Sequence, residues 1–301
     1  MKKFVIVSDS CCELTEDLRK KYDVEYLPMY ISYEDKSVQA DLEWKALSAT
    51  DFYNILRSGT RIFTSQVPAG DYLERFEAYA KAGYDILSIS CSSALSSSVK
   101  ASMVARDEVK QKYPDTEIIC IDSLICSFGL GLLCIHASNL RAQGKSIQEV
   151  AEEIESLKMN VNQLGTVDEL QFLKRAGRIS ASKALFGTVL NVKPIIISNH
   201  KGENVSTEKV KGRNNSMRRL TELTKEQYTG EKVKDIFIAH GDCLQDAEKV
   251  KAMILEQFPD VNITIGMLNA AMGASCGPKT LIVYFVGQEK QNTEEIQKTA
   301  G

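Results

Sequence analysis

The chain has 301 residues, 44% of them hydrophobic, and a formal net charge of -3. This length and apolar content are typical of a globular protein of about two domains. Because a slightly acidic chain generates no global positive field, we expect no nucleic-acid partner.

The apolar runs and the cysteines both favour a cytoplasmic protein. The longest apolar runs, such as Gly129 to Ile135, are too short to span a bilayer. The apolar run at the start of the chain meets Ser8 and Asp9 too soon for a signal peptide, so we interpret it as a strand. None of the eight cysteines forms a C-x-x-C pair and several lie in apolar runs, which favours small buried side chains over metal ligands or disulfides.

In the first half of the chain, short β-branched runs alternate with helical patterns. Strands are predicted at Val5 to Val7, Asp85 to Cys91 and Glu117 to Ile121. Helices are predicted from about Leu14 to Tyr22, Trp44 to Ser58, Asp71 to Ala82, Ser97 to Lys112, Gly129 to Gln143 and Ile147 to Met159. A strand followed by a polar turn and a helix, repeated in this way, predicts parallel βαβ units.

The second half of the chain has more strands and fewer clear helices. Strands are predicted at Pro194 to Ser198, Lys234 to Ala239, Asn262 to Met267 and Thr280 to Phe285, and the clearest helix at Leu244 to Phe258. This pattern predicts a mixed sheet with helices. We therefore expect an α/β protein with an N-terminal parallel βαβ domain at residues 1–160, a C-terminal mixed-sheet α/β domain at 161–289, and a frayed polar tail at 290–301.

Serines crowd the turn that follows the predicted strand at Asp85. Five serines occupy seven positions from Ser92 to Ser98, directly before a predicted helix. Hydroxyls at a helix start cap free backbone N–H groups, and the same helix end favours an anion. The carboxyl end of a parallel strand is also where open α/β sheets bind ligands. Capping alone and anion binding both remain open from this stretch by itself.

A second hydroxyl group lies upstream, in Thr64-Ser65-Gln66 ahead of Pro68 and a predicted helix. Taken by itself, this segment is explained by ordinary turn chemistry.

A series of short motifs runs through the chain in a fixed order. They are Val7 to Ser10, Thr64 to Pro68, Ser92 to Ser96, Asp122 to Gly131, Leu173 to Ile179 and Lys193 to Ile195. In this order and spacing they resemble motifs of the DegV family, whose members bind fatty acids. Each motif is weak alone, but together they are specific, and the resemblance covers nearly the whole chain.

The resemblance implies a DegV-like fold of two α/β domains with a long-chain fatty acid between them, no other cofactor, no metal and no catalytic residue. By resemblance, Thr64 and Ser96 hold the fatty acid carboxylate, with Ser93 nearby and with Ser65 and Ser98 in the same motifs. A carboxylate accepts several hydrogen bonds, which neutral hydroxyls and helix N–H groups can donate without a buried counter-charge.

The chain also departs from the family pattern. Val67 precedes Pro68 where the family has Pro directly after Gln, and Ala176 replaces a Gly. Ser97 stands where the family has Gly. Near the C-terminus, Ser275 stands where the family has His and Lys279 where it has Gly. The last two departures put in doubt any head-group contact of that His.

Partner contacts are also implied by the resemblance. Some family members engage a separate fatty acid kinase through a basic region, which corresponds here to Lys211 and Arg213, with Arg178 on the same face. The simpler interpretation of these charges is a solvated helix start. A basic patch of this kind also predicts transient contact with anionic membranes.

Other functions have less support in the sequence than fatty acid binding. A hydrolase or acyltransferase that uses Ser96 with His240 lacks a G-x-S-x-G motif, and we interpret His240 as a strand-end residue. His136 is expected to be structural and His200 solvated in a hairpin turn. The sequence contains no H-E-x-x-H, P-loop or G-x-G-x-x-G motif, and a lipid sensor without a kinase remains an alternative.

Overall fold

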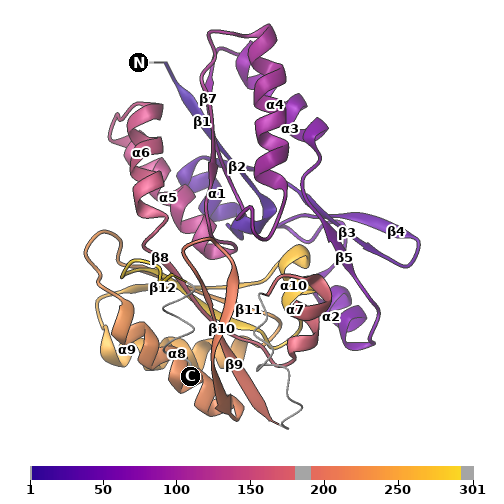
Figure 1. Ribbon diagram of the computed structural model, residues 1–301, viewed down its shortest axis with the longest axis vertical. Coiled ribbons are helices and arrows are strands. Elements are labelled where there is room, and N and C mark those ends of the chain that lie inside the picture. The colour runs from indigo at the N-terminus through magenta and orange to yellow at the C-terminus, as the bar shows by residue number, and fades with distance from the viewer. Residues whose placement is uncertain (1, 180–190, 293–301) are drawn as a thin grey trace.

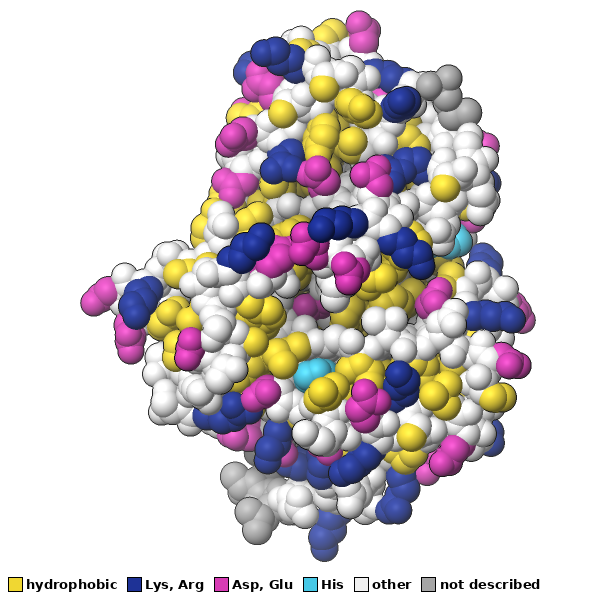
Figure 2. Space-filling view, turned by 180° about the vertical axis from the view of Figure 1, so that it is seen from behind, with side chains coloured by type: hydrophobic (Ala, Val, Ile, Leu, Met, Phe, Trp, Pro, Cys, Tyr) yellow, Lys and Arg dark blue, Asp and Glu magenta, His cyan; other side chains and the backbone are white. Residues whose placement is uncertain are grey.

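A computed structural model describes residues 2–179 and 191–292 of the chain (Figure 1). Two main sheets lie one above the other in Figure 1, with the N-terminal half of the chain at the top and the C-terminal half at the bottom. On the face seen in Figure 2, acidic and basic side chains are interspersed over both halves, as the small net charge leads one to expect.

The N-terminal sheet has four strands in the order β2-β1-β6-β7, and all of its strand pairs are parallel. Its strands are β1 (Phe4–Asp9), β2 (Val24–Leu27), β6 (Asp85–Ser90) and β7 (Ile118–Asp122). All six residues of β6 are buried, because helices cover both faces of a parallel sheet. The predicted βαβ arrangement is therefore confirmed.

Five helices accompany this sheet in the described residues. They are α1 (Glu16–Tyr22), α3 (Ala69–Lys81), α4 (Ser98–Lys112), α5 (Phe128–Ala142) and α6 (Ile147–Leu157). Each matches a predicted helix to within three residues. The first turn of α6 shows why the match is close: Ser146 and Glu149 form a reciprocal capping box that fixes where the helix begins.

The segment between β2 and α3 was largely missed by the prediction. It forms a separate antiparallel sheet of β4 (Lys36–Ala40), β3 (Met29–Tyr33) and β5 (Phe63–Ser65), in that order, and helix α2 (Ala49–Arg57). The predicted start of α2 at Trp44 is wrong, because the Ser48 side chain caps the helix by accepting from Asp51 N–H.

The C-terminal sheet has six strands in the order β10-β9-β8-β13-β11-β12, and of these pairs only β11 with β12 is parallel. The strands are β8 (Val161–Thr166), β9 (Val192–Ser198), β10 (Asn204–Lys211), β11 (Asp235–His240), β12 (Asn262–Met267) and β13 (Leu281–Val286). The helices are α7 (Leu170–Ala176), α8 (Arg213–Gln227), α9 (Leu244–Gln257) and α10 (Ala270–Cys276). The predicted mixed sheet is confirmed, although β8, β10, α7 and α10 were not predicted.

The central strand β13 shows how the two halves pack together. Leu281, Val283 and Phe285 belong to a core with α8 and α9. On the opposite face, Ile282 and Tyr284 join one continuous core with the N-terminal half. Residues of a strand alternate between faces, so β13 is buried on both sides and supports the contact between the halves.

Helix α5 is the main N-terminal element in that contact. Its Phe128 ring stacks on Phe237 of β11 at a centroid distance of 5.1 Å. The same ring lies against Gly266 of β12, where an added Cβ would meet it at 2.3 Å. The glycine is therefore required for this close approach.

The chain after β13 returns to the connection between α6 and β8. The Lys290 backbone N–H donates to the Met159 carbonyl, and the Lys290 amine donates to the Leu124 carbonyl at 2.7 Å. Lys290 is buried, so the expectation of a frayed tail is wrong at this residue. Residues 293–301 of the predicted tail lie outside the described residues. His200 lies in the β9–β10 hairpin turn as predicted, but it is half-buried rather than solvated.

Seven of the eight cysteines are buried and all eight are free thiols, as the sequence predicted, and Cys120 is half-buried. Within the described ranges, no helix has both the length and the apolar character needed to cross a bilayer.

Candidate functional site

A cavity lies where the carboxyl ends of the N-terminal strands approach α7 and α10. We call it the inner cavity. Thr64 and Ser96 both line it, although they come from separate motifs and separate elements. Its other lining residues are Cys11, Met29, Cys91, Leu95, Cys126, Leu173, Arg178, Asn204, Ala271, Met272, Ser275 and Cys276. The fold therefore brings together the two hydroxyls that the sequence placed at one site.

Ser96 is held in place by its neighbour on the next helix. Its hydroxyl oxygen lies 3.0 Å from that of Ser98 and accepts from the Ser98 backbone N–H at 3.2 Å. The Ser98 hydroxyl in turn accepts from the Val67 N–H at 3.4 Å. Ser98 is fully buried and does not line the cavity. The N-cap residue of α4, Ser97, makes no side-chain cap hydrogen bond, whereas Ser96 satisfies the N–H of the first helical residue and still reaches the cavity.

The remaining predicted hydroxyls lie outside the cavity. Ser65 is exposed on β5, next to the half-buried Thr64. Ser93 is also exposed, and its backbone N–H donates to the Asp122 carboxylate at 3.1 Å. The structure thus brings Thr64 and Ser96 together but leaves Ser65 and Ser93 facing solvent.

Sulfur atoms make up much of the cavity wall, which the sequence reasoning missed. Cys11, Cys91, Cys126 and Cys276 line the cavity together with Met29 and Met272. Burial raises the pKa of Cys126, and it raises that of Cys276 to about 12. These two thiols therefore stay protonated and behave as small apolar groups that suit a hydrocarbon chain.

Asp9 fixes two of the cysteines. Its carboxylate accepts from the Cys11 N–H at 3.0 Å and from the Cys91 N–H at 2.9 Å. The strands β1 and β6 are neighbours, so one carboxylate at the end of β1 reaches both turns. Burial raises the pKa of Asp9 to about 6, against the lowering effect of these backbone hydrogen bonds.

A second void continues from the inner cavity towards the C-terminal sheet. The two voids share the lining residues Cys126, Leu173, Asn204, Met272 and Cys276. The second void extends to Val167, Ile196 and Ile282. The two voids therefore lie side by side behind Thr64 and Ser96, with largely apolar side chains between them.

Both voids are narrow in this state. Their cavity volumes are about 40 and 20 Å³, well below the roughly 300 Å³ at which ligand pockets begin. A long acyl chain therefore requires the wall to move. Met29 and Met272 are the side chains best suited to do so, because methionine is unbranched and flexible.

Two side-chain amides in the wall of the second void are hydrogen-bonded in series. The Gln163 amide donates to the Asn204 side-chain oxygen at 2.9 Å, and the Asn204 amide donates to the Arg178 carbonyl at 2.9 Å. This pair of hydrogen bonds fixes the backbone of Arg178, whose side chain lines the inner cavity.

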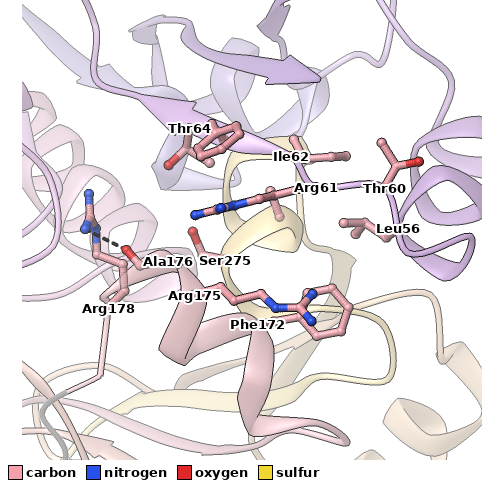
Figure 3. Close-up of a pocket in the computed structure, with 12 residues that line it drawn as sticks. Leu56, Thr60, Arg61, Ile62, Thr64, Phe172, Arg175, Ala176, Arg178 and Ser275 are labelled. Atoms are coloured by element: carbon pink, nitrogen blue, oxygen red, sulfur yellow. Dashed lines mark hydrogen bonds between the residues drawn. The ribbon is translucent and has the colours of Figure 1, made fainter. Parts of the chain in front are cut away.

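The inner cavity opens to the surface through a wider cleft, which we call the outer cleft (Figure 3). The two share Thr64, Arg178 and Ser275. Ser275, where the family pattern has His, lies on α10 and its hydroxyl donates to the Ala271 carbonyl at 3.3 Å. Lys279 is exposed, and its amine lies 4.0 Å from Asp168.

Helix α10 is positioned by the N-terminal half. The Asn269 side chain caps the helix by accepting from the Met272 N–H at 3.0 Å. Both carboxylate oxygens of Glu13 accept from the Asn269 N–H, at 3.1 and 3.0 Å. Desolvation raises the pKa of Glu13 well above its usual value. A buried contact between the halves therefore sets where Ser275 stands.

The predicted partner residues do not lie together. Arg178 lies in the cleft and donates to the Ala176 carbonyl at 2.8 Å. Lys211 is exposed at the end of β10, roughly 20 Å along that strand from Asn204, which contacts Arg178. Arg213 is engaged with Asp246 of α9 at 2.9 Å. Of the three residues, Arg178 alone lines the inner cavity and the cleft.

The structure does not form the Ser–His pair of the hydrolase alternative. His240 is buried, and its Nδ1 accepts from the Cys243 N–H at 3.2 Å. His240 does not line the inner cavity, where Ser96 lies. The Ser96 hydroxyl is instead hydrogen-bonded to the Ser98 hydroxyl. Across residues 2–179 and 191–292, no cluster of His, Cys, Asp or Glu side chains is arranged to hold a metal ion.

Comparison with known proteins places these features in a wider group. The model of the DegV family, described as uncharacterised proteins, matches residues 3–288. A DegV domain-containing protein of Clostridium perfringens is 37% identical over 291 residues, which covers 97% of this chain and 100% of the relative.

Two solved structures share the fold closely. A DegV family protein from Thermus thermophilus, described by its fatty acid binding, has a TM-score of 0.85 and 24% identity, covering 95% of this chain and all of its own. DegV of Bacillus subtilis, described as a fatty acid binding protein, has a TM-score of 0.83 and 24% identity, covering 96% of this chain and all of its own. At these identities the likeness establishes the fold.

Proposed function

Because this chain belongs to the DegV family, we propose that it binds a long-chain fatty acid, with the carboxylate at Thr64 and Ser96 and the acyl chain in the sulfur-lined path behind them. One observation carries the proposal: hydroxyls from two distant segments meet in a cavity that has a second, largely apolar void behind it. Such an arrangement fits a molecule with one acidic end and a hydrocarbon tail.

The tail supplies most of the gross driving force for binding. Each buried methylene contributes about 0.8 kcal/mol, so a chain of about fifteen carbons gains on the order of 12 kcal/mol before ordering costs. Part of that energy is spent in widening the narrow path, because the wall must move. The head group then selects an acid over other lipids through its hydrogen bonds.

The position of the head group supports a carrier role. Thr64 lines both the inner cavity and the outer cleft, so a carboxylate held there faces the opening rather than the protein interior. We propose that a separate fatty acid kinase phosphorylates the bound acid from this side. In that role Arg178 is the contact residue nearest the head group, while Lys211 and Arg213 are more distant contacts.

Mass spectrometry of lipid extracted from the purified protein tests fatty acid binding. We expect a long-chain acid in the extract, or binding of added palmitate where the extract is empty. The absence of both results would overturn the proposal. A pull-down for a partner that makes acyl phosphate in the presence of ATP then separates the carrier from a lipid sensor that works without a kinase.

A further inference from the structure

Two side-chain amides stand in the largely apolar wall of the second void. Gln163 of β8 and Asn204 of β10 both line this void, and Asn204 also lines the inner cavity. The two residues are buried, with exposed fractions of 4% and 7%. Amides at this depth are costly unless their hydrogen bonds are made, so an aliphatic wall would be the simpler lining for a plain hydrocarbon tail.

The geometry of β8 directs the Gln163 side chain into the void. Leu164 belongs to the core with α8 and α9, whereas Val161 belongs to the core shared with the N-terminal half. Gln163 is two residues from Val161, so it lies on the face of the sheet towards the N-terminal half. The thiol of Cys126, which lines both voids, donates to the Gln163 side-chain oxygen at 3.4 Å. The amide therefore lies against the void.

The amide pair keeps hydrogen-bonding capacity after its internal bonds are made. The Gln163 amide donates to the Asn204 side-chain oxygen, and the Asn204 amide donates to the Arg178 carbonyl, both at 2.9 Å. Each amide nitrogen carries two hydrogens and each amide oxygen two lone pairs. Within residues 2–179 and 191–292, each nitrogen donates one bond and each oxygen accepts one. Both a donor and an acceptor therefore remain for a ligand.

Two threonines also line the second void, but they offer less to a ligand. The Thr280 hydroxyl lies 2.9 Å from two backbone carbonyl oxygens, so its proton is already used. Thr166 pairs with Leu281 across the strands, and Leu281 belongs to the core with α8 and α9. Since paired residues of neighbouring strands share a face, the Thr166 side chain points away from the void.

We propose that the Gln163–Asn204 pair binds a hydroxyl group carried along the acyl chain, so that the ligands of this protein include hydroxy fatty acids. This inference rests on the proposed function, because the carboxylate is held at Thr64 and Ser96. A hydroxyl both donates and accepts, which matches the free N–H and oxygen of the amide pair. Asn204 lines both voids, so the hydroxyl lies where the chain passes from one to the other.

A series of acids with the same C18 chain tests the site. It contains stearic acid and the hydroxystearic acids with the hydroxyl at the third, seventh or twelfth carbon. Displacement of a fluorescent fatty acid measures each affinity. A buried hydroxyl without a partner weakens binding, so we expect one positional isomer to bind at least as tightly as stearate and the others to bind more weakly. If every isomer bound more weakly than stearate, the proposal would be overturned.

The double variant Gln163→Met/Asn204→Leu removes both amides and keeps similar side-chain volumes. We expect the affinity of the preferred isomer relative to stearate to fall about tenfold, because its hydroxyl is left unsatisfied. Asn162→Leu is the matched control and should keep the native ratio. Asn162 is a buried amide of the same strand that donates to the Asn160 and Gln288 carbonyls and does not line the void.

The outcomes separate this proposal from the proposed function. If neither stearate nor any hydroxystearate binds the native chain, the proposed function fails. If stearate binds, and the double variant has the same ratio of affinities as the native chain, the hydroxyl site is overturned while fatty acid binding stands. The single variant Gln163→Met, which keeps the bond from Asn204 to the Arg178 carbonyl, replaces the double variant if the latter does not fold. The same fall in the ratio is then expected, and an unchanged ratio overturns the site.

Discussion

The hydroxyl oxygens of Ser96 and Ser98 lie 3.0 Å apart, and only that of Ser96 faces the inner cavity. Ser98 begins helix α4 and also accepts from the N–H of Val67, beyond the Thr64 turn. One buried serine thus ties together the two segments that carry the proposed carboxylate ligands. The geometry of Thr64 relative to Ser96 depends on a residue that the ligand does not reach.

Replacing both cavity hydroxyls should weaken fatty acid binding. For Thr64→Ala/Ser96→Ala we expect a loss of palmitate affinity of about tenfold or more, since hydrogen bonds to a charged group contribute about 1.5–3 kcal/mol each. Displacement of a fluorescent fatty acid measures it. Ser65→Ala/Ser93→Ala removes two exposed hydroxyls of the same motifs and should leave the affinity unchanged. Equal affinities for both double variants would contradict the assigned roles.

Replacing Ser98 should act indirectly. In Ser98→Ala the Val67 N–H loses its hydrogen-bond partner in a buried place, which costs about 1–3 kcal/mol of folding stability. We expect a lower urea midpoint for unfolding, and a smaller loss of palmitate affinity than for Ser96→Ala. If Ser98→Ala weakened binding more than Ser96→Ala at unchanged stability, Ser98 would be the ligand and the assignment reversed.

Filling the junction between the two voids should shorten the acyl chain that the protein accepts. Cys276 lines both voids, so Cys276→Phe places a ring in the path of the tail. We expect preference to shift from C16 to shorter acids, as measured by displacement across a chain-length series. Cys276→Ala is the matched control, since it widens the path and should retain C16 binding. An unchanged chain-length profile in Cys276→Phe would show that the tail runs elsewhere.

The sequence predicts the scaffold of this site better than its lining. The strand at Asp85 and the helix after Ser97 follow from hydrophobic runs and helix-start residues, which are local signals. The strand at Met29 to Tyr33 was not predicted, although its β-branched and aromatic residues are also a local signal, and its residues alternate between buried and half-buried in the structure. By contrast, no local pattern distinguishes Ser96 from Ser98, because which hydroxyl faces the cavity depends on where α4 begins.

The arginines that line the outer cleft show a second limit of sequence reasoning. Arg61 belongs to the strand region before Thr64, whereas Arg175 and Arg178 come from α7 and its end, more than a hundred residues later. They meet because the two halves pack together, and no short-range pattern encodes that contact. A usable signal did exist for the cysteines: Cys91 is the last residue of one predicted parallel strand and Cys11 comes shortly after another, at the sheet edge where an open α/β sheet binds its ligand.

The buried Asp9 predicts a stability that changes with pH. Its pKa rises on folding from 3.8 to about 6, so the folded state holds a proton that the unfolded state has already released. The contribution of Asp9 is therefore present below about pH 4 and is lost as the pH rises to about 6, by on the order of 3 kcal/mol. Glu13, whose pKa is also raised, acts in the same direction.

Urea unfolding between pH 4 and pH 7 measures this effect. We expect the free energy of unfolding to fall less steeply over this range in Asp9→Asn than in the native chain. Asp107→Asn, at an exposed position on α4, provides the control for a simple loss of charge. A native-like slope in Asp9→Asn would show that another group titrates instead.

Lys290 gives the opposite dependence on pH. Burial lowers its pKa from 10.5 to about 7, so above pH 7 the folded state keeps the amine neutral while the unfolded state binds a proton. Stability should therefore rise between about pH 7 and pH 10.

Lys290→Met keeps the apolar stem and removes the titrating amine. It should therefore raise the free energy of unfolding at pH 6 by several kcal/mol, minus the contribution of the lost hydrogen bond to the Leu124 carbonyl. The gain should shrink towards pH 10, where the native amine is neutral in the folded protein. Lys201→Met, at an exposed position of the neighbouring hairpin, is the control and should show neither effect in the same unfolding series. If Lys290→Met raised the free energy of unfolding by the same amount at all pH values, titration of Lys290 would be excluded as the cause.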